Sequence, residues 1–316
     1  MLANLLYCLN ATMPIFLMMV LGYIFRRINV ISEQFTKEMN AFVFKIALPV
    51  LVFSELYKED FADVWDTKFV IFCFGATFVS IVILAIITVV FKKIDDKAEF
   101  IQASFRSSAA LLGVGIVQNL YGDAGFVPLM IVGAVPLYNI TAVVLLTVFK
   151  PGKKEKLSKE TIKNTVYGII TNPIILGIVV GFLASIIKIP NPVIFEKSVH
   201  YIGNLATPLG LIALGASLDF KSIGKNIGTV VSATMFKLVI FCAMFLPLAI
   251  QLGYRRDKLL AILIMLGSPT TVSSFVMAKS MGHDGQTSAG VVMCTTLFSA
   301  FTLTLWLFVL KTMGLI

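Results

Sequence analysis

Long apolar runs recur along the whole chain, and they limit its fold more than any other feature. A bilayer core about 30 Å thick needs about 20 apolar residues of helix, whereas a membrane β-barrel would show short alternating segments. Only 14% of the residues are charged, against about 25% in soluble domains. The sequence therefore predicts an all-α integral membrane protein with ten transmembrane helices, at residues 4–25, 37–56, 68–91, 98–120, 125–149, 164–187, 195–218, 227–251, 257–280 and 287–311.

The distribution of Lys and Arg between the connecting loops predicts the orientation of the spans. Fifteen basic residues, including Arg26, Arg27 and the six lysines from Lys150 to Lys163, fall on one side, and eight fall on the other. Cytoplasmic loops are enriched in Lys and Arg, so we expect a multi-pass protein of the cytoplasmic (inner) membrane with both termini on the outer face. No basic residue precedes the first apolar run, which is therefore expected to be a retained span rather than a signal peptide. The net charge of +9 is interpreted as topology, and no nucleic acid partner is expected.

A repeat relates the two halves of the chain. Residues 12–23, TMPIFLMMVLGY, and residues 171–182, TNPIILGIVVGF, share six identities at an offset of 159 positions. The same offset pairs ALP at 47–49 with ATP at 206–208. Each half holds an odd number of spans, so the repeat is predicted to be inverted, as in many secondary transporters. We expect a first five-helix repeat at 1–149, a basic cytoplasmic linker at 150–163 and a second five-helix repeat at 164–316.

The segment GSPTTVSS at residues 267–274 places glycine, proline and five hydroxyl side chains in the middle of the ninth span. Its repeat partner in the fourth span, SSAALLGVG at 107–115, is also rich in serine and glycine. A broken membrane helix frees backbone groups that are tolerated where they line a cavity or meet a ligand, and helix N-termini attract anions. The alternative is that small residues only allow close helix packing. We expect broken, crossing fourth and ninth helices whose substrate-binding residues are Ser107, Ser108, Gly113, Gly115, Ser268, Pro269, Thr270, Thr271, Ser273 and Ser274.

Three basic residues lie inside predicted spans, where charges are costly and commonly functional. Arg106 directly precedes the serine pair of the fourth span and is expected to contribute to an anion site, with a structural pairing or a snorkelling side chain as the alternative. Lys45 is expected to face the same cavity, and Asn139 of the fifth span joins the candidate substrate-binding set. Lys237 is expected to neutralise the end of a neighbouring helix. No Asp or Glu is found mid-span, so we expect the substrate to supply the negative charge.

Four segments resemble the auxin efflux carrier family of membrane transporters, in its prokaryotic branch: ALPVLVF (47–53), FRSSAALLGVGIVQNLYG (105–122), ATPLGLIALGASL (206–218) and SPTTVSSFVMAKSMGHDG (268–285). The resemblance covers essentially the whole chain. It implies a scaffold domain of spans 1, 2, 6 and 7 and a transport domain of spans 3–5 and 8–10 that moves like an elevator. It also implies organic carboxylate substrates, such as malate, malonate or an auxin-like acid, and a homodimer formed through the scaffold domain. The chain departs from the family pattern at Ser108 and Gly115, where the family often has Asn and Pro, and at Pro269, which lies a turn before the second crossover proline of plant members.

The sequence thus predicts a secondary transporter that moves a small organic anion by elevator-type alternating access. The alternative is a sodium-coupled organic anion symporter of the bile-acid-transporter type, which buried acidic residues would favour. An intramembrane enzyme needs a constellation of catalytic side chains, but His200 and His283 both lie near span ends. Enzyme activity, a cofactor and a metal site are therefore not expected. The expected partners are the organic anion and membrane lipid, and the coupling ion is left open.

Overall fold

The computed structural model of the chain is described for residues 14, 17–57, 65–90, 96–108, 117, 126–150, 166–167, 170–188, 192–218, 220, 224 and 226–316. Within these ranges all regular secondary structure is helical. Residues 17–27 are helical, and the helices that follow are α2 (Glu33–Phe42), η1 (Val43–Ala47), α3 (Leu48–Tyr57), α4 (Thr67–Val90), α5 (Lys97–Phe105), α7 (Val127–Val148), α9 (Pro173–Ile187), α10 (Val193–Asn204), α11 (Ala206–Ala216), α13 (Ile227–Met235), η2 (Phe236–Ile240), α14 (Phe241–Gln251), α15 (Arg256–Gly267), α16 (Ser273–Ser280) and α17 (Gln286–Thr312).

Five helical segments of the described chain are long and apolar enough to cross a membrane, judged by length and composition. They are Thr67–Val90, Leu129–Val148, Val193–Ala216, Ile227–Gln251 and Gln286–Thr312, and the shorter α9 is also apolar. The prediction of a helical, multi-pass membrane protein is confirmed. The count of ten spans and the inverted order of the halves stay predictions.

Two spans change their helical geometry just before a proline. The π-helical segment η1 lies directly before Leu48 and Pro49, and the turn at Leu205 that separates α10 from α11 comes three residues before Pro208. Proline has no N–H to donate, and its ring crowds the carbonyl four residues earlier. The two prolines are 159 positions apart, so both distortions occur at the register of the sequence repeat.

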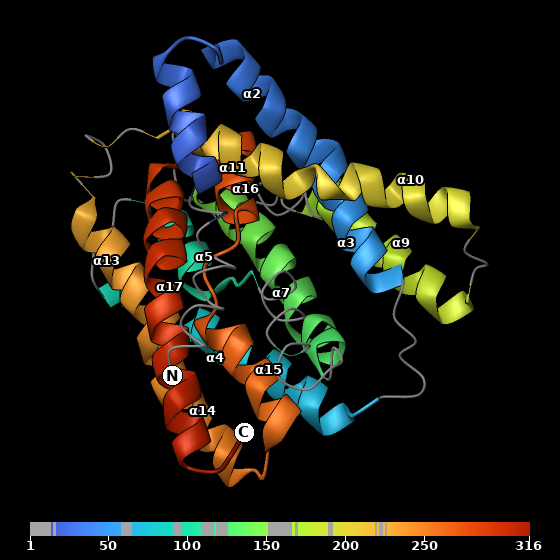
Figure 1. Ribbon diagram of the computed structural model, residues 1–316, viewed down its shortest axis with the longest axis vertical. Coiled ribbons are helices and arrows are strands. Elements are labelled where there is room, and N and C mark those ends of the chain that lie inside the picture. Colours follow the sequence, from blue (N-terminus) through green and yellow to red (C-terminus); the bar gives the residue numbers. More distant parts are fainter. Residues whose placement is uncertain are drawn as a thin grey trace.

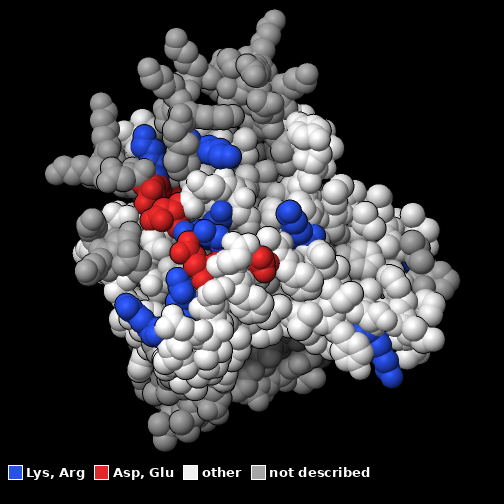
Figure 2. Space-filling view, turned by 90° about the horizontal axis from the view of Figure 1, so that it is seen from above, with Lys and Arg blue, Asp and Glu red and all other residues white. Residues whose placement is uncertain are grey.

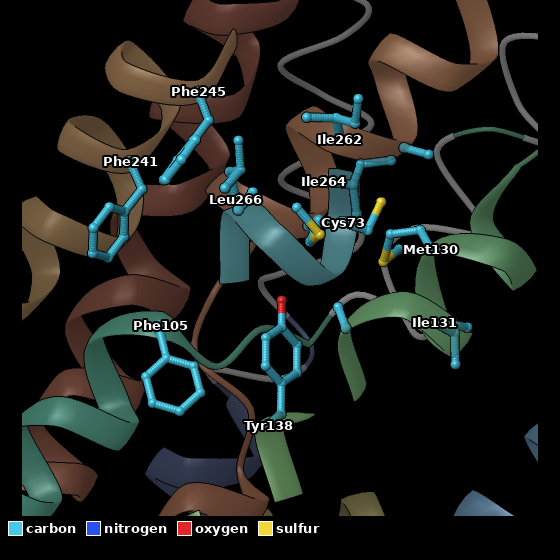
Figure 3. Close-up of a cluster of buried hydrophobic side chains, with 14 of the residues drawn as sticks. Cys73, Phe105, Met130, Ile131, Tyr138, Phe241, Phe245, Ile262, Ile264 and Leu266 are labelled. Atoms are coloured by element: carbon cyan, nitrogen blue, oxygen red, sulfur yellow. The ribbon is translucent and has the colours of Figure 1, made fainter. Parts of the chain in front are cut away.

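The helices pack as two groups (Figure 1). In the first helix group, defined as residues 17–27, α2, η1, α3, α9, α10 and α11, helix α3 packs against α9 and α10, and α2 packs against α11. In the second helix group, defined as α4, α5, α7, α13, η2 and α14 to α17, helix α4 packs against α7 and α13 against α17. The main apolar core lies in the second group. There the rings of Phe105 and Tyr138 lie 5.8 Å apart, in a cluster that also holds Met130, Phe241 and Ile264 (Figure 3).

Glycines allow the backbones of the first helix group to approach closely. A Cβ atom added to Gly181 of α9 would lie 2.8 Å from the carbonyl oxygen of Phe53 in α3, and one added to Gly22 would overlap the carbonyl oxygen of Ile212 in α11. Gly181 follows Gly22 by 159 positions, and Ile212 follows Phe53 by the same interval. The repeat offset therefore relates the two contacts: Gly22 corresponds to Gly181, and Phe53 corresponds to Ile212.

Contacts between distant loops join residues that the charge analysis assigns to the same side of the membrane. On the predicted outer side, Lys258 Nζ lies 2.6 Å from Asp66 Oδ2. On the predicted cytoplasmic side, Thr287 Oγ1 donates to Asp96 Oδ2 at 3.0 Å, and the His283 ring contacts the Leu146 carbonyl at 2.8 Å. The alternation of loops between two sides is consistent with the predicted spans, although which side faces the cytoplasm stays a prediction.

Replacing Gly181 by Ala is expected to destabilise the protein, because the added Cβ has a backbone oxygen 2.8 Å away and the helices must separate. Overpacking of this kind costs about 1–3 kcal/mol. Gly75→Ala in α4 is the matched control, since its Cβ would meet nothing within 4 Å. The thermal midpoint of each purified variant in detergent tests this, and equal midpoints for the two variants would contradict the close packing.

The Asp66–Lys258 ion pair is expected to make stability depend on acidity. The Lys258 ammonium and the Phe69 N–H hold the pKa of Asp66 below its ordinary value. A lowered folded-state pKa contributes stability that is complete above the unfolded pKa of about 3.9 and is lost as pH falls through the folded pKa. Asp66→Asn keeps an acceptor for the Phe69 N–H but loses the charge. Its thermal midpoint should lie below that of the wild type at neutral pH, and the difference should vanish at strongly acidic pH.

Candidate functional site

Two helices of the second helix group end inside the protein, and their ends meet. Helix α15 ends at Gly267 and α16 begins at Ser273, so the break predicted in the ninth span is present. Helix α5 ends at Phe105, and the backbone of Arg106 is extended (ψ 146°), as is that of Ser268 (ψ 158°). The Ser108 N–H donates to the Pro269 carbonyl at 2.8 Å. Most of the fourth span beyond Ser108 lies outside the described residues, so the crossing of two broken helices stays a prediction.

Hydroxyl groups from each break satisfy backbone carbonyls of the other. Ser107 Oγ donates to the Ile264 carbonyl at 3.2 Å, and Thr270 Oγ1 donates to the Ala103 carbonyl at 2.6 Å. The hydroxyls of Ser107 and Ser268 are hydrogen-bonded to each other. An unpaired buried carbonyl costs about 1–3 kcal/mol, so these bonds explain how two broken helices are tolerated in an apolar interior.

Lys237 supplies a further donor at the end of α15. Its side chain is 1% exposed, and its Nζ atom lies 3.1 Å from the Met265 carbonyl oxygen and 2.7 Å from that of Leu266. The C-terminal end of a helix carries partial negative charge. The expectation that Lys237 neutralises the end of a neighbouring helix therefore agrees with the structure.

Arg106 lies fully inside the protein but does not meet a carboxylate of the described residues. Its guanidinium donates to Asn139 Oδ1 at 2.9 Å, to Ser273 Oγ at 2.7 Å and to Met277 Sδ at 2.9 Å, with a longer contact of 3.4 Å to Gln102 Oε1. Its Nε atom is buried and has no hydrogen-bond partner within the described part of the chain. The neighbours thus orient the guanidinium through neutral atoms and leave its charge without an opposite charge.

A cavity of about 90 Å³ lies between the two helix groups, beside Arg106. A single water needs about 10–15 Å³ on this measure, so the cavity has room for several waters or a small solute. Its polar lining comes from the second helix group, namely Arg106, Ser107, Ser108, Asn139, Thr271 and Ser273. The first helix group contributes a mainly apolar wall of Val43, Leu48, Leu51, Val52, Ile174, Ala206 and Thr207.

The N-terminus of α16 opens onto this cavity. Thr271, Val272 and Ser273 all line it, and among the described residues their backbone N–H groups have no hydrogen-bond partner. No side chain caps this end of the helix. Free N–H groups and the positive end of the helix dipole make such a terminus attractive to an anion.

The structure brings most of the predicted site residues together. Arg106, Ser107, Ser108, Asn139, Thr271 and Ser273 line the cavity, and Ser268, Pro269 and Thr270 hold the backbones beside it. The Ser274 side-chain hydroxyl is buried without a partner, while its carbonyl accepts from Gln102. Gly113 and Gly115 lie outside the described residues.

Lys45 is not beside Arg106, contrary to expectation. It lines a second cavity of about 970 Å³ together with Arg26, Lys37 and Lys279. Figure 2 looks at the protein from the top of Figure 1 and shows basic and acidic residues gathered on that face. Val43, two positions earlier in the same helical segment, lines the central cavity instead. Residues two positions apart on a helix point in different directions, which explains the separation.

The sequence analysis did not single out Glu99, which is a fully buried carboxylate two residues into the predicted fourth span. Glu99 Oε1 accepts from the Gly285 N–H at 2.7 Å and Oε2 from the Ser288 N–H at 2.9 Å, so it caps the N-terminus of α17. Gln102 and Arg106 follow it by three and seven positions. That spacing places all three on one face of a helix. It was the signal in the sequence that could have identified Glu99 as a buried residue.

Thr270→Val is expected to destabilise the protein by about 1–3 kcal/mol, because the Ala103 carbonyl loses its hydroxyl donor in a buried position. Thr271→Val is the matched control, since the Thr271 hydroxyl contacts only the Ser273 hydroxyl and is partly exposed to the cavity. Thermal midpoints in detergent compare the two. A larger loss for Thr271→Val would contradict the mutual capping of the breaks.

Comparison with known proteins places this architecture in a family. A family model described as "Membrane transport protein" matches residues 7–307. The chain is 23% identical to the "Putative malonate transporter" of Rhizobium meliloti over 308 residues, which cover 95% of this chain and 94% of the relative. It is 20% identical to an uncharacterized transporter of Methanothermobacter thermautotrophicus, over 95% of this chain and 98% of that protein. A transporter of Methanocaldococcus jannaschii, also uncharacterized, is 22% identical over 94% and 97% of the two chains.

These matches run along nearly the whole chain, as the sequence resemblance did, and they are to transporters rather than to enzymes. The chain belongs to the membrane transport protein family that includes the auxin efflux carriers.

Proposed function

We propose that this protein is a secondary transporter that moves a small organic carboxylate across the membrane and binds it in the cavity beside Arg106. The observation that carries the proposal is the charge balance of the buried residues. Glu99, Arg106 and Lys237 are the three described Asp, Glu, Lys or Arg side chains that are almost completely buried, with 0%, 2% and 1% exposure. Charges in such positions are costly unless they are compensated.

Two of the three charges face a helix end of opposite sign. The Glu99 carboxylate faces the N-terminus of α17, and the Lys237 ammonium faces the C-terminus of α15. Arg106 differs, because its hydrogen-bond partners are neutral and its Nε atom has none. Its missing counter-charge is the anion that we assign to the cavity.

The surroundings of Arg106 suit a carboxylate in particular. A guanidinium binds carboxylate oxygens through a planar fork of N–H donors, and the free N–H groups of Thr271, Val272 and Ser273 offer further donors nearby. The apolar wall of the first helix group accommodates the hydrocarbon part of the solute. The name of one relative refers to malonate, so malonate is the first substrate to try, followed by malate.

The arrangement supports alternating access between an inverted pair of repeats. The glycine contacts and the proline distortions occur in pairs at an offset of 159 positions, as two-fold related halves require. The cavity is shared by two helix groups, and most of its polar lining, Arg106 included, belongs to the second of them. In this proposal the second helix group corresponds to the transport domain and carries the anion past the first, which corresponds to the scaffold domain.

The sodium-coupled alternative is less well supported. A carboxylate that binds sodium needs an oxygen available to the ion, whereas both oxygens of Glu99 accept backbone N–H groups. Among the described residues no group of three or more His, Cys, Asp or Glu side chains is arranged to hold a metal ion.

Malonate is expected to raise the thermal midpoint of the purified protein, since a ligand that binds only the folded state stabilises it by about 2.7 kcal/mol at a hundredfold excess over its dissociation constant. Arg106→Met should abolish this shift and malonate uptake into proteoliposomes, because the uncompensated charge is removed. Arg27→Met is the matched control, since Arg27 is exposed and its guanidinium lies against the hydroxyl and ring of Tyr23, away from the cavity.

Arg106→Lys, which keeps the charge but loses the fork, should retain a weaker shift. A wild-type response to malonate in Arg106→Met would place the anion elsewhere. A panel in which neutral or cationic solutes stabilise the protein and no carboxylate does would overturn the proposed substrate class.

A further inference from the structure

The second buried cation, Lys237, lies where the carbonyls of a broken helix converge. Helix α15 ends at Gly267, and its last-turn carbonyls at Met265 and Leu266 both point to the Lys237 ammonium, at 3.1 and 2.7 Å. In transporters with discontinuous helices, unwound carbonyls and the C-terminal ends of half-helices are the groups that coordinate sodium or protons. The ammonium therefore holds a position that is chemically suited to a coupling cation.

Neighbouring residues enclose the Lys237 side chain. Lys237 belongs to the π-helical segment η2, which turns the side chain toward the break in α15. Cys242 packs against Gly267, with its sulfur 2.9 Å from the position of an added Cβ. The Trp306 indole N–H donates to the carbonyl of Leu238, the residue next to Lys237, at 3.1 Å and fixes η2 against α17. No carboxylate of the described chain pairs with the ammonium, so its charge acts on the helix end alone.

The first half of the chain has a different arrangement of charge at its own helix break. At the repeat offset of 159 positions the residue equivalent to Lys237 is Phe78 of α4, and at 160 positions, the offset that pairs Gly122 with Gly282, it is Thr77. Both side chains are neutral, and the Thr77 hydroxyl lies 4.0 Å from the Met265 sulfur. The cation at the end of α5 is Arg106 itself, which lines the cavity. One break therefore carries a cation exposed to a ligand, and the other carries a cation that is enclosed.

We propose that Lys237 is a resident cation that takes the place of a coupling ion at the α15 break, so that the transport site is assembled without sodium. This inference rests on the proposed transport function and assigns Lys237 the role of a positioning residue. It holds the carbonyl end of α15. It thereby positions Ser268 and Thr270, which follow directly and fix the backbone segments that carry the anion site.

The test compares thermal midpoints of the full-length protein in NaCl and in choline chloride at about 0.15 M ionic strength, without any carboxylate. The wild type should show the same midpoint in both salts. Lys237→Ser should have a lower midpoint in choline, and sodium or methylammonium should restore part of the loss, because the vacated carbonyls are then open to a small cation. Lys237→Arg should behave like the wild type, and the exposed Lys311→Ser should be unaffected by the choice of salt.

A saturable sodium-dependent stabilisation of the wild type would overturn the proposal, because a separate cation site would then exist. A Lys237→Ser variant that is destabilised equally in all salts would also overturn it, since Lys237 would then be a structural donor only. If Lys237→Ser fails to fold, the wild type and Lys237→Arg still decide the first of these outcomes. Because no carboxylate is added, failure of the malonate experiment and failure of this one are distinguishable.

Discussion

An apolar interior offers no water to a broken helix, and the centre of this protein is organised around that constraint. Several carbonyls at the ends of α5 and α15 accept hydrogen bonds from the other break or from a neighbouring helix, namely those of Ala103, Ile264, Met265 and Leu266. Ser107 and Thr270 provide hydroxyls in reciprocal directions, and the Ser108 N–H reaches Pro269 directly. Each break therefore contributes to the stability of the other. The cavity between the two helix groups lies beside these paired breaks.

The same constraint explains how the buried charges are distributed. Helix ends carry about half an elementary charge, and the protein uses them as partners for Glu99 and Lys237 in place of opposite side chains. A helix end is a fixed partner that does not leave the site, so these two charges are compensated within the protein. Arg106 is held by neutral atoms, which orient the guanidinium without neutralising it. This difference separates Arg106, to which we assign the substrate anion, from the two charges that helix ends compensate.

Sequence reasoning predicted the features that depend on local composition. The apolar runs gave the helical membrane fold, and the cluster of Gly, Pro, Ser and Thr at 267–274 gave the break between α15 and α16. Lys237 was correctly associated with a helix end, because a cation deep in a span has few other partners.

Features that depend on long-range packing were not predictable from sequence. Ser273 reaches Arg106 across 167 positions, and the partners of Glu99 lie 186 and 189 positions away. Glu99 was overlooked because it lies near the start of the predicted span. An acidic side chain in that position is commonly taken to face the water at the membrane surface. Lys45 was misplaced because Val43, two positions earlier on the same helical segment, faces the central cavity and Lys45 therefore points in another direction.

The two walls of the central cavity also differ in how finely they distinguish solutes. Hydrogen-bond donors around Arg106 reject a molecule that leaves them unpaired, and such selectivity is steep. The opposite wall is mainly apolar, with side chains such as Val43, Leu48, Leu51 and Ile174, and Thr207 is its one hydroxyl among the described lining residues. One methylene more or less changes binding to such a surface by only about 1–3 kcal/mol. For the carboxylate that we propose, a pocket built this way selects more strongly on the acid group than on the tail, so related acids compete for it according to both their concentrations and their affinities.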